Sequence, residues 1–225
     1  MENINEYQQV RNAVEKHPYK TQFFQEMLLN YLPEMRLAIR GGHLTKVEGW
    51  RNILEHQAVE IVAMDIFCDL LGVESKSKKK LMSAVAYHDW NKRLELGKIN
   101  EDQINVEQTK SYLEILHPDQ QLLDAVEPGF LHELENNQPN LLQLAMFYID
   151  DITFESTIMP MKDRLINSKD RNPDWERELK LGKYVESQLF DIIKKRDVPV
   201  ATPSDIPTLI LKGIQEKMDS LLIPK

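Results

Sequence analysis

The 225-residue chain has 36 acidic and 28 basic residues, which gives a formal net charge of −8 at neutral pH. This acidic balance argues against extensive contact with duplex nucleic acid, because binding phosphate groups generally requires a basic surface. A single cysteine excludes an intramolecular disulfide bond and fits a reducing compartment. The sequence lacks the run of ~20 apolar residues that crosses a bilayer, and residues 1–9 are unlike a secretory signal. We therefore expect a cytoplasmic protein that makes no membrane contact.

Helical periodicity of the apolar residues predicts an all-α protein. Pro33 should bend or break the second expected helix, and Pro128-Gly129 should interrupt the sixth. We expect residues 1–225 to form a single helical domain. The expected helices span residues 5–18, 21–39, 44–71, 77–91, 106–116, 120–135, 139–154, 174–195 and 206–222.

His56 lies within the expected helix 44–71, on an apolar stripe that should face inward. Steps of three or four residues from it reach Val59, Ala63 and Phe67. Glu60 follows His56 by about one helical turn, where it can orient the imidazole through a hydrogen bond or simply face solvent.

The expected helix 77–91 ends in His88-Asp89, and Lys92 follows three residues after the aspartate. Adjacent side chains on a helix diverge by about 100°, so His88 and Asp89 can converge only where the helix ends or unwinds. A divalent metal would favour such convergence. Taken alone, most pairs of this kind are a helix-terminal histidine beside a solvated aspartate.

The expected helix 139–154 contains a run, LLQLAMFYI, that is apolar apart from Gln143, and it then reaches Asp150-Asp151. Two carboxylates that close so apolar a run need either water or a cation near them.

The order His56, then His88-Asp89, then Asp150 resembles the HD-domain superfamily of metal-dependent phosphohydrolases. Lys92 also matches the His-Asp-x-x-Lys context of many members. Trp90-Asn91 replaces the small residues usual after the pair, which narrows the site. The resemblance covers about residues 40–165 and leaves a C-terminal helical extension of about 166–225.

The resemblance implies an HD-domain-like helical bundle with additional N- and C-terminal helices. It also implies that His56, His88, Asp89 and Asp150 bind one divalent metal ion. We favour Asp150 as the ligand, because the isoleucines that flank it match the family pattern better. Asp151 is the alternative. The ligand set does not distinguish Mn, Co, Ni, Mg, Zn or Fe, and a second metal is left open.

An enzyme of this kind would hydrolyse a phosphomonoester or phosphodiester in a small phosphorylated metabolite or nucleotide. Asp89 would bind the metal and guide the attacking water, and Lys92 would neutralise charge that develops on the phosphate. One alternative is a catalytically degenerate HD-fold protein with a binding or regulatory role. Another is an HD-type di-iron oxygenase, which would need His43, His117 or His132 as further ligands.

Several other residues have weaker functional interpretations. Cys68 falls in an apolar stretch and should be a core thiol. The basic run 76–80, Arg51, Lys162 and Arg164 can contact a phosphate, although such side chains more often face solvent or form surface ion pairs. The amphipathic C-terminal helices can serve as an interface, so a homo-oligomer is left open.

Overall fold

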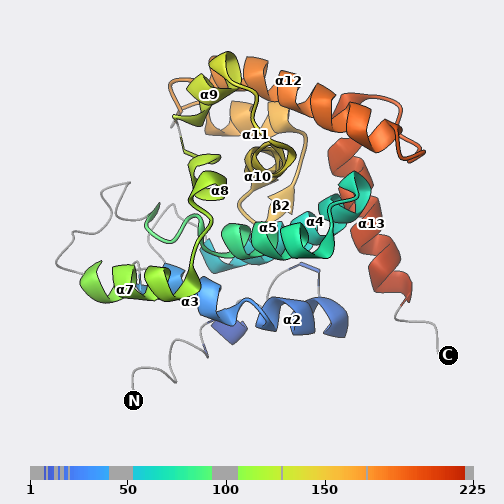
Figure 1. Ribbon diagram of the computed structural model, residues 1–225. Helices are drawn as coiled ribbons and strands as arrows, with labels where there is room; N and C mark the ends of the chain where they lie inside the picture. Colours follow the sequence, from blue (N-terminus) through green and yellow to red (C-terminus); the bar gives the residue numbers. More distant parts are fainter. Residues whose placement is uncertain are drawn as a thin grey trace.

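The computed structural model describes residues 8, 10–12, 15, 18–19, 21–40, 53–92, 106–127, 129–170 and 172–220. These residues form the predicted all-α structure, with one short β-hairpin added to it (Figure 1). The elements in chain order are α2 (Gln22–Leu29), α3 (Leu32–Arg40), α4 (Ile53–Leu71), α5 (Ser75–Tyr87), α7 (Val106–Leu116), α8 (Gln120–Asp124), α9 (Phe130–Asn136), α10 (Leu141–Ile152), β1 (Thr153–Phe154), β2 (Thr157–Ile158), α11 (Met161–Ser168), α12 (Trp175–Lys194), the 3₁₀ turn η2 (Pro203–Asp205) and α13 (Ile206–Ser220).

The interruptions that the sequence predicts in two of its helices are confirmed. The expected helix 21–39 is divided into α2 and α3, and Pro33 lies in the first turn of α3. A proline at that position removes no hydrogen bond from the helical ladder. The expected helix 120–135 is likewise divided, because α8 ends at Asp124 and α9 begins at Phe130.

Helix α10 lies at the centre of the molecule, and Figure 1 views it almost along its axis. It packs against α4 and α5 on one side and against α11 and α12 on the other. Every side chain from Leu144 to Ile149 is buried, and α4 is buried along most of its length. Helices that are buried on most sides are expected in a protein interior, and these two lie at the middle of a core to which the surrounding helices also contribute.

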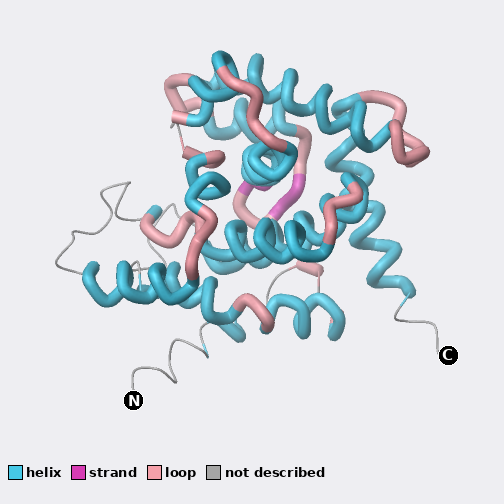
Figure 2. The backbone as a smooth tube through the Cα atoms, viewed as in Figure 1, coloured by secondary structure: helices cyan, strands magenta, loops and turns pink. Residues whose placement is uncertain are grey.

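The hairpin β1–β2 follows directly after α10 (Figure 2). Its strands pair antiparallel, with Thr153 opposite Ile158, and both strands contact α4. The backbone becomes extended at Thr153, whose hydroxyl donates a 2.8 Å hydrogen bond to the carbonyl of Ile149. Glu155 occupies the turn with a positive φ of 57°. The hairpin therefore places a turn of irregular backbone against the central helices.

The C-terminal part of the chain packs on the same central helices. Helix α11 was not among the expected helices, although Met161 and Leu165 form a buried stripe at i, i+4 spacing. Helix α12 contacts α10, α11 and α4, and α13 contacts α4. Gly213 permits this last contact, because a Cβ atom there would lie 2.5 Å from Cγ2 of Ile66.

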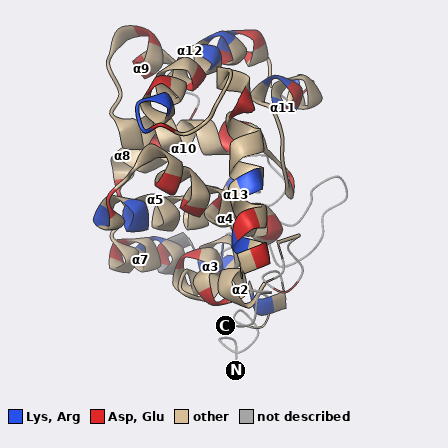
Figure 3. Ribbon diagram, turned by 90° about the vertical axis from the view of Figure 1, so that its right-hand side faces the viewer, with Lys and Arg blue, Asp and Glu red and all other residues tan. Residues whose placement is uncertain are grey.

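Acidic and basic residues are mixed on the described helices (Figure 3). Within the basic run, Lys78 lies 2.7 Å from Asp65 and 2.6 Å from Asp69, and Lys80 lies 3.2 Å from Asp119. These two lysines are therefore engaged by carboxylates. Among the described residues, no helix has the length and apolar character needed to span a membrane.

We predict that Gly213→Val destabilises the protein by about 1–3 kcal/mol, because the added side chain overpacks the contact with Ile66. Gly129→Val is the matched control, since a Cβ atom at Gly129 would meet nothing within 4 Å. Both changes restrict the unfolded chain equally. Urea unfolding followed by circular dichroism measures the difference, and equal stability of the two variants would contradict this packing.

Candidate metal centre

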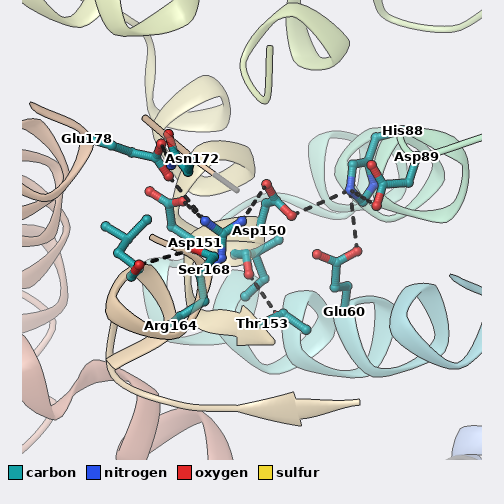
Figure 4. A network of polar contacts seen from close by, with 12 residues as sticks. Glu60, His88, Asp89, Asp150, Asp151, Thr153, Arg164, Ser168, Asn172 and Glu178 are labelled. Carbon is teal, nitrogen blue, oxygen red and sulfur yellow. Dashed lines mark hydrogen bonds and ion pairs between the residues drawn. The ribbon is translucent and has the colours of Figure 1, made fainter. Parts of the chain in front are cut away.

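Four side chains from separate parts of the chain converge at a buried point. His56 and Glu60 come from α4, His88 follows the last residue of α5, and Asp150 lies near the end of α10. One donor atom of each lies within 4.8 Å of the corresponding atoms of the other three. Figure 4 shows Glu60 and Asp150 directed toward His88. The sequence motifs that suggested a common site are thus brought together in space.

Glu60 is a member of the cluster that the resemblance did not include. Its Oε1 lies 3.2 Å from Nε2 of His56, and its Oε2 lies 3.7 Å from Nε2 of His88. The residue is completely buried, so the solvent-facing interpretation is wrong. The signal for it was present in the sequence, since an i, i+4 spacing places Glu60 on the face of α4 that carries His56.

His88 and Asp89 approach the same point because α5 ends at Tyr87. The backbone tightens there, and the amide of Trp90 donates to the carbonyl of Tyr87, three residues earlier, at 3.0 Å. Asp89 Oδ2 then lies 3.7 Å from Nε2 of His88 and 3.8 Å from Nε2 of His56.

Asp150, rather than Asp151, faces the cluster. Asp150 Oδ1 lies 3.8 Å from Nε2 of His56 and 3.7 Å from Nε2 of His88. Asp151 turns to the other side of α10, where its Oδ1 lies 3.4 Å from Nη1 of Arg164. Burial raises the pKa of Asp151 well above its usual value, despite the nearby guanidinium.

Both imidazole rings are oriented by backbone carbonyl groups. Nδ1 of His56 lies 2.8 Å from the carbonyl oxygen of Glu155 in the hairpin turn, and Nδ1 of His88 lies 3.0 Å from that of Val85. A carbonyl oxygen only accepts, so each Nδ1 carries the hydrogen and each neutral ring directs its Nε2 lone pair into the cluster. Metal-binding histidines are typically oriented in this way.

The carboxylates strongly favour protonated imidazoles in the metal-free protein. Burial alone would lower the pKa of His88, but Glu60, Asp89 and Asp150 together raise it to about 10. Burial would also lower the pKa of His56, but the carboxylates, Glu60 most strongly, raise it well above its usual value. Burial would raise the pKa of Asp150, yet its contacts with the two histidines hold it well below its usual range.

Three buried atoms of the cluster have no hydrogen-bond partner, namely both carboxylate oxygens of Glu60 and Nε2 of His88. An unsatisfied buried polar group costs on the order of 1–3 kcal/mol, and more when it is charged. A divalent cation held by this group of residues would supply the missing partner, since Glu60 and His88 each offer it a donor atom. Imidazole nitrogens combined with carboxylate oxygens are ligands that suit Mn, Fe, Co, Ni or Zn, so the residues present fit a divalent metal ion.

Two carboxylates of the site each form an ion pair with a basic side chain. Asp89 Oδ1 lies 3.1 Å from Nζ of Lys92, and Asp150 Oδ2 lies 3.5 Å from Nη2 of Arg164. In each case the other oxygen of the carboxylate lies near the imidazoles. Arg164, for which the sequence suggested a phosphate contact or a solvated position, lies against Asp150 and Asp151.

The side chains of the cluster and of Lys92 differ in their exposure to solvent. The side chains of His88 and Glu60 are 2% and 0% exposed, whereas those of His56, Asp150 and Lys92 are 13%, 21% and 37% exposed. A ligand would therefore approach past Lys92 and the outer edges of His56 and Asp150.

Other residues considered from the sequence lie elsewhere. His117 and His132 are exposed and do not belong to the cluster, and Lys162 is also exposed. Cys68 is a buried free thiol, as predicted, and burial raises its pKa to about 12. His43 and Arg51 lie outside the described residues.

Comparison of the chain with protein-family models, curated proteins and solved structures found no match. The helical architecture and the buried cluster are compatible with the HD-domain resemblance. Membership of that family stays a prediction.

We predict that Glu60→Gln weakens Mn²⁺ binding by more than about tenfold, because a ligand should matter at least as much as the residues that orient ligands. Glu186→Gln is the matched control. Glu186 is also buried, but it accepts a 2.9 Å hydrogen bond from Tyr148 outside the cluster. Calorimetric titration measures both variants, and equal affinities would contradict a ligand role for Glu60.

Metal binding should release protons at neutral pH. His88 has a pKa of about 10 and that of His56 is raised well above 6.5, so both rings are protonated at pH 7.5 without metal. A metal binds only the neutral ring, so affinity should increase as the pH rises toward 10. Calorimetry in buffers of different ionisation enthalpy should detect the release of up to two protons per Mn²⁺. Binding without proton release would mean that these nitrogens are not ligands.

Proposed function

We propose that the protein is a metal-dependent phosphohydrolase that acts on a small phosphorylated metabolite or nucleotide. The observation that carries the proposal is the convergence of two oriented imidazoles on three carboxylates, of which Glu60 is buried with both oxygens facing imidazole nitrogens and without a hydrogen bond. Phosphate as the reacting group is supported by the resemblance to the HD-domain superfamily and by the position of Lys92 at the accessible side of the cluster.

His56, Glu60, His88 and Asp150 would hold one divalent ion, and Asp89 lies beside them within reach of both imidazoles. Such an ion, when bound, lowers the pKa of water and polarises a phosphoryl oxygen. The protein keeps both Nε2 lone pairs directed inward through the Nδ1 contacts described above.

Asp89 is suited to orient the attacking water. Its Oδ1 is held by Lys92 and its Oδ2 is directed toward the imidazoles, so the carboxylate can accept a hydrogen bond from water at a defined position. Burial would raise the pKa of Asp89, but His88 and Lys92 lower it below its usual value. Asp89 is therefore ionised and ready to accept at neutral pH.

Lys92 is suited to meet the substrate. Its side chain is 37% exposed and its Nζ lies 3.1 Å from Asp89, at the side of the cluster that solvent reaches. An ammonium group placed there can neutralise negative charge that accumulates on a phosphoryl group in the transition state. Because Lys92 lies 3.1 Å from Asp89, the cation and the water-orienting carboxylate would act on the same phosphoryl group.

We predict that protein loaded with Mn²⁺, Co²⁺ or Ni²⁺ releases phosphate from members of a panel of nucleotides, sugar phosphates and aryl phosphates. His56→Ala should abolish metal binding and activity together while the far-ultraviolet circular dichroism spectrum stays largely unchanged. His132→Ala is the matched control, because His132 is exposed and lies outside the cluster.

Loaded protein that releases no phosphate across the panel would contradict the hydrolase and favour a role in binding alone. Loss of activity in His132→Ala as well would indicate that hydrolysis does not arise at the cluster.

A further inference from the structure

Arg164 projects from α11 into a group of three carboxylates behind the metal centre (Figure 4). Its Nη2 lies 3.5 Å from Asp150 Oδ2, and its Nη1 lies 3.4 Å from Asp151 Oδ1 and 3.2 Å from Glu178 Oε1. The side chain is 18% exposed. The guanidinium thus joins the end of α10 to α12 through one planar group.

Glu178, the partner of Arg164 on α12, is itself held by a second hydrogen bond. Glu178 accepts a 3.2 Å hydrogen bond from Nη1 of Arg164, and its other oxygen accepts a 2.6 Å hydrogen bond from the amide of Asn172. A planar guanidinium held at one nitrogen presents its remaining nitrogens in a set direction. Arg164 is therefore a fixed partner for Asp150.

The two oxygens of Asp150 have different surroundings. Oδ1 lies 3.8 and 3.7 Å from the imidazole nitrogens of His56 and His88, whereas Oδ2 lies against Arg164. We propose that Arg164 is a positioning residue that holds Asp150 with Oδ1 directed into the centre, so that Asp150 binds a cation through that single oxygen. This inference rests on the metal centre of the proposed function.

Removing Arg164 has two opposing effects on a cation bound nearby. Loss of its positive charge would by itself favour a bound metal ion. However, the same loss removes the contact that holds Oδ2 of Asp150, so the carboxylate can rotate and its Oδ1 can turn out of the centre. Residues that orient metal ligands typically change affinity about 10–100-fold. We therefore expect the loss of orientation to dominate.

The test compares Mn²⁺ dissociation constants of the full chain by calorimetry, together with the increase in Tm that saturating Mn²⁺ produces. Arg164→Gln should weaken binding about tenfold or more and should reduce the Mn²⁺-induced increase in Tm. Arg164→Lys should recover part of the affinity, because it keeps the charge but not the planar fork. Arg177→Gln is the matched control, since Arg177 is an exposed arginine paired with Glu135 at 2.6 Å.

A purely structural role would lower the Tm of metal-free Arg164→Gln and leave its Mn²⁺ affinity within twofold of the wild type, which would overturn the inference. An equal loss in Arg177→Gln would overturn it too. If Arg164→Gln does not fold, the Mn²⁺ affinity of Arg164→Lys is the deciding measurement. An affinity equal to that of the wild type in Arg164→Lys would then overturn the inference. Failure of the wild type itself to bind Mn²⁺ would instead contradict the metal centre.

Discussion

Glu60, completely buried between two imidazole rings, imposes an electrostatic constraint on the centre of this protein. A carboxylate in such a position requires positive charge within a few ångströms. The carboxylates hold the pKa of His88 near 10 and raise that of His56 well above its usual value. Without metal, a proton on each histidine therefore supplies the positive charge. One divalent cation carries the same charge as those two protons. The centre can therefore exchange one for the other without changing its total charge.

The ends of two helices decide which side chains share this centre. In α10, Asp150 and Asp151 are both followed by a further helical residue, so their side chains diverge; both contact Arg164, but Asp150 alone reaches the imidazoles. After α5 the helix has already ended, so the adjacent residues His88 and Asp89 turn toward the same point. One rule about successive side chains thus explains both a convergent pair and a divergent pair.

The sequence predicted the parts of this structure that depend on local pattern. Periodic apolar residues located α4, α5 and α10, and the ends of α5 and α10 drew attention to His88, Asp89 and Asp150. Glu60 was considered as a partner of His56 or as a solvent-facing residue, because spacing on one helix cannot show that another histidine approaches from α5. The carbonyl of Glu155 was not predicted, since it acts through the backbone of a hairpin whose strands have two residues each.

The part of the chain predicted as a C-terminal extension contributes to the centre indirectly, because its residue Glu178 contacts Arg164 at the end of the HD-like region. Arg164 leaves α11 to reach Asp150, and its orientation depends on Glu178 in α12. Such a contact has no signature in the sequence, because a charged residue after a core helix usually faces solvent.

Folding stability and cation binding favour different residues at position 60. Replacing a buried charged group with a well-packed apolar side chain is often neutral or stabilising, so stability alone would favour leucine or methionine there. An apolar residue would leave the imidazoles of His56 and His88 facing fewer carboxylates, and the two rings would lose the carboxylate that raises their pKa most strongly. They would then be less readily protonated, and a cation would find one ligand fewer. The buried carboxylate of Glu60 therefore costs folding free energy but gives the centre a ligand for a divalent cation. Binding of that cation would offset the cost.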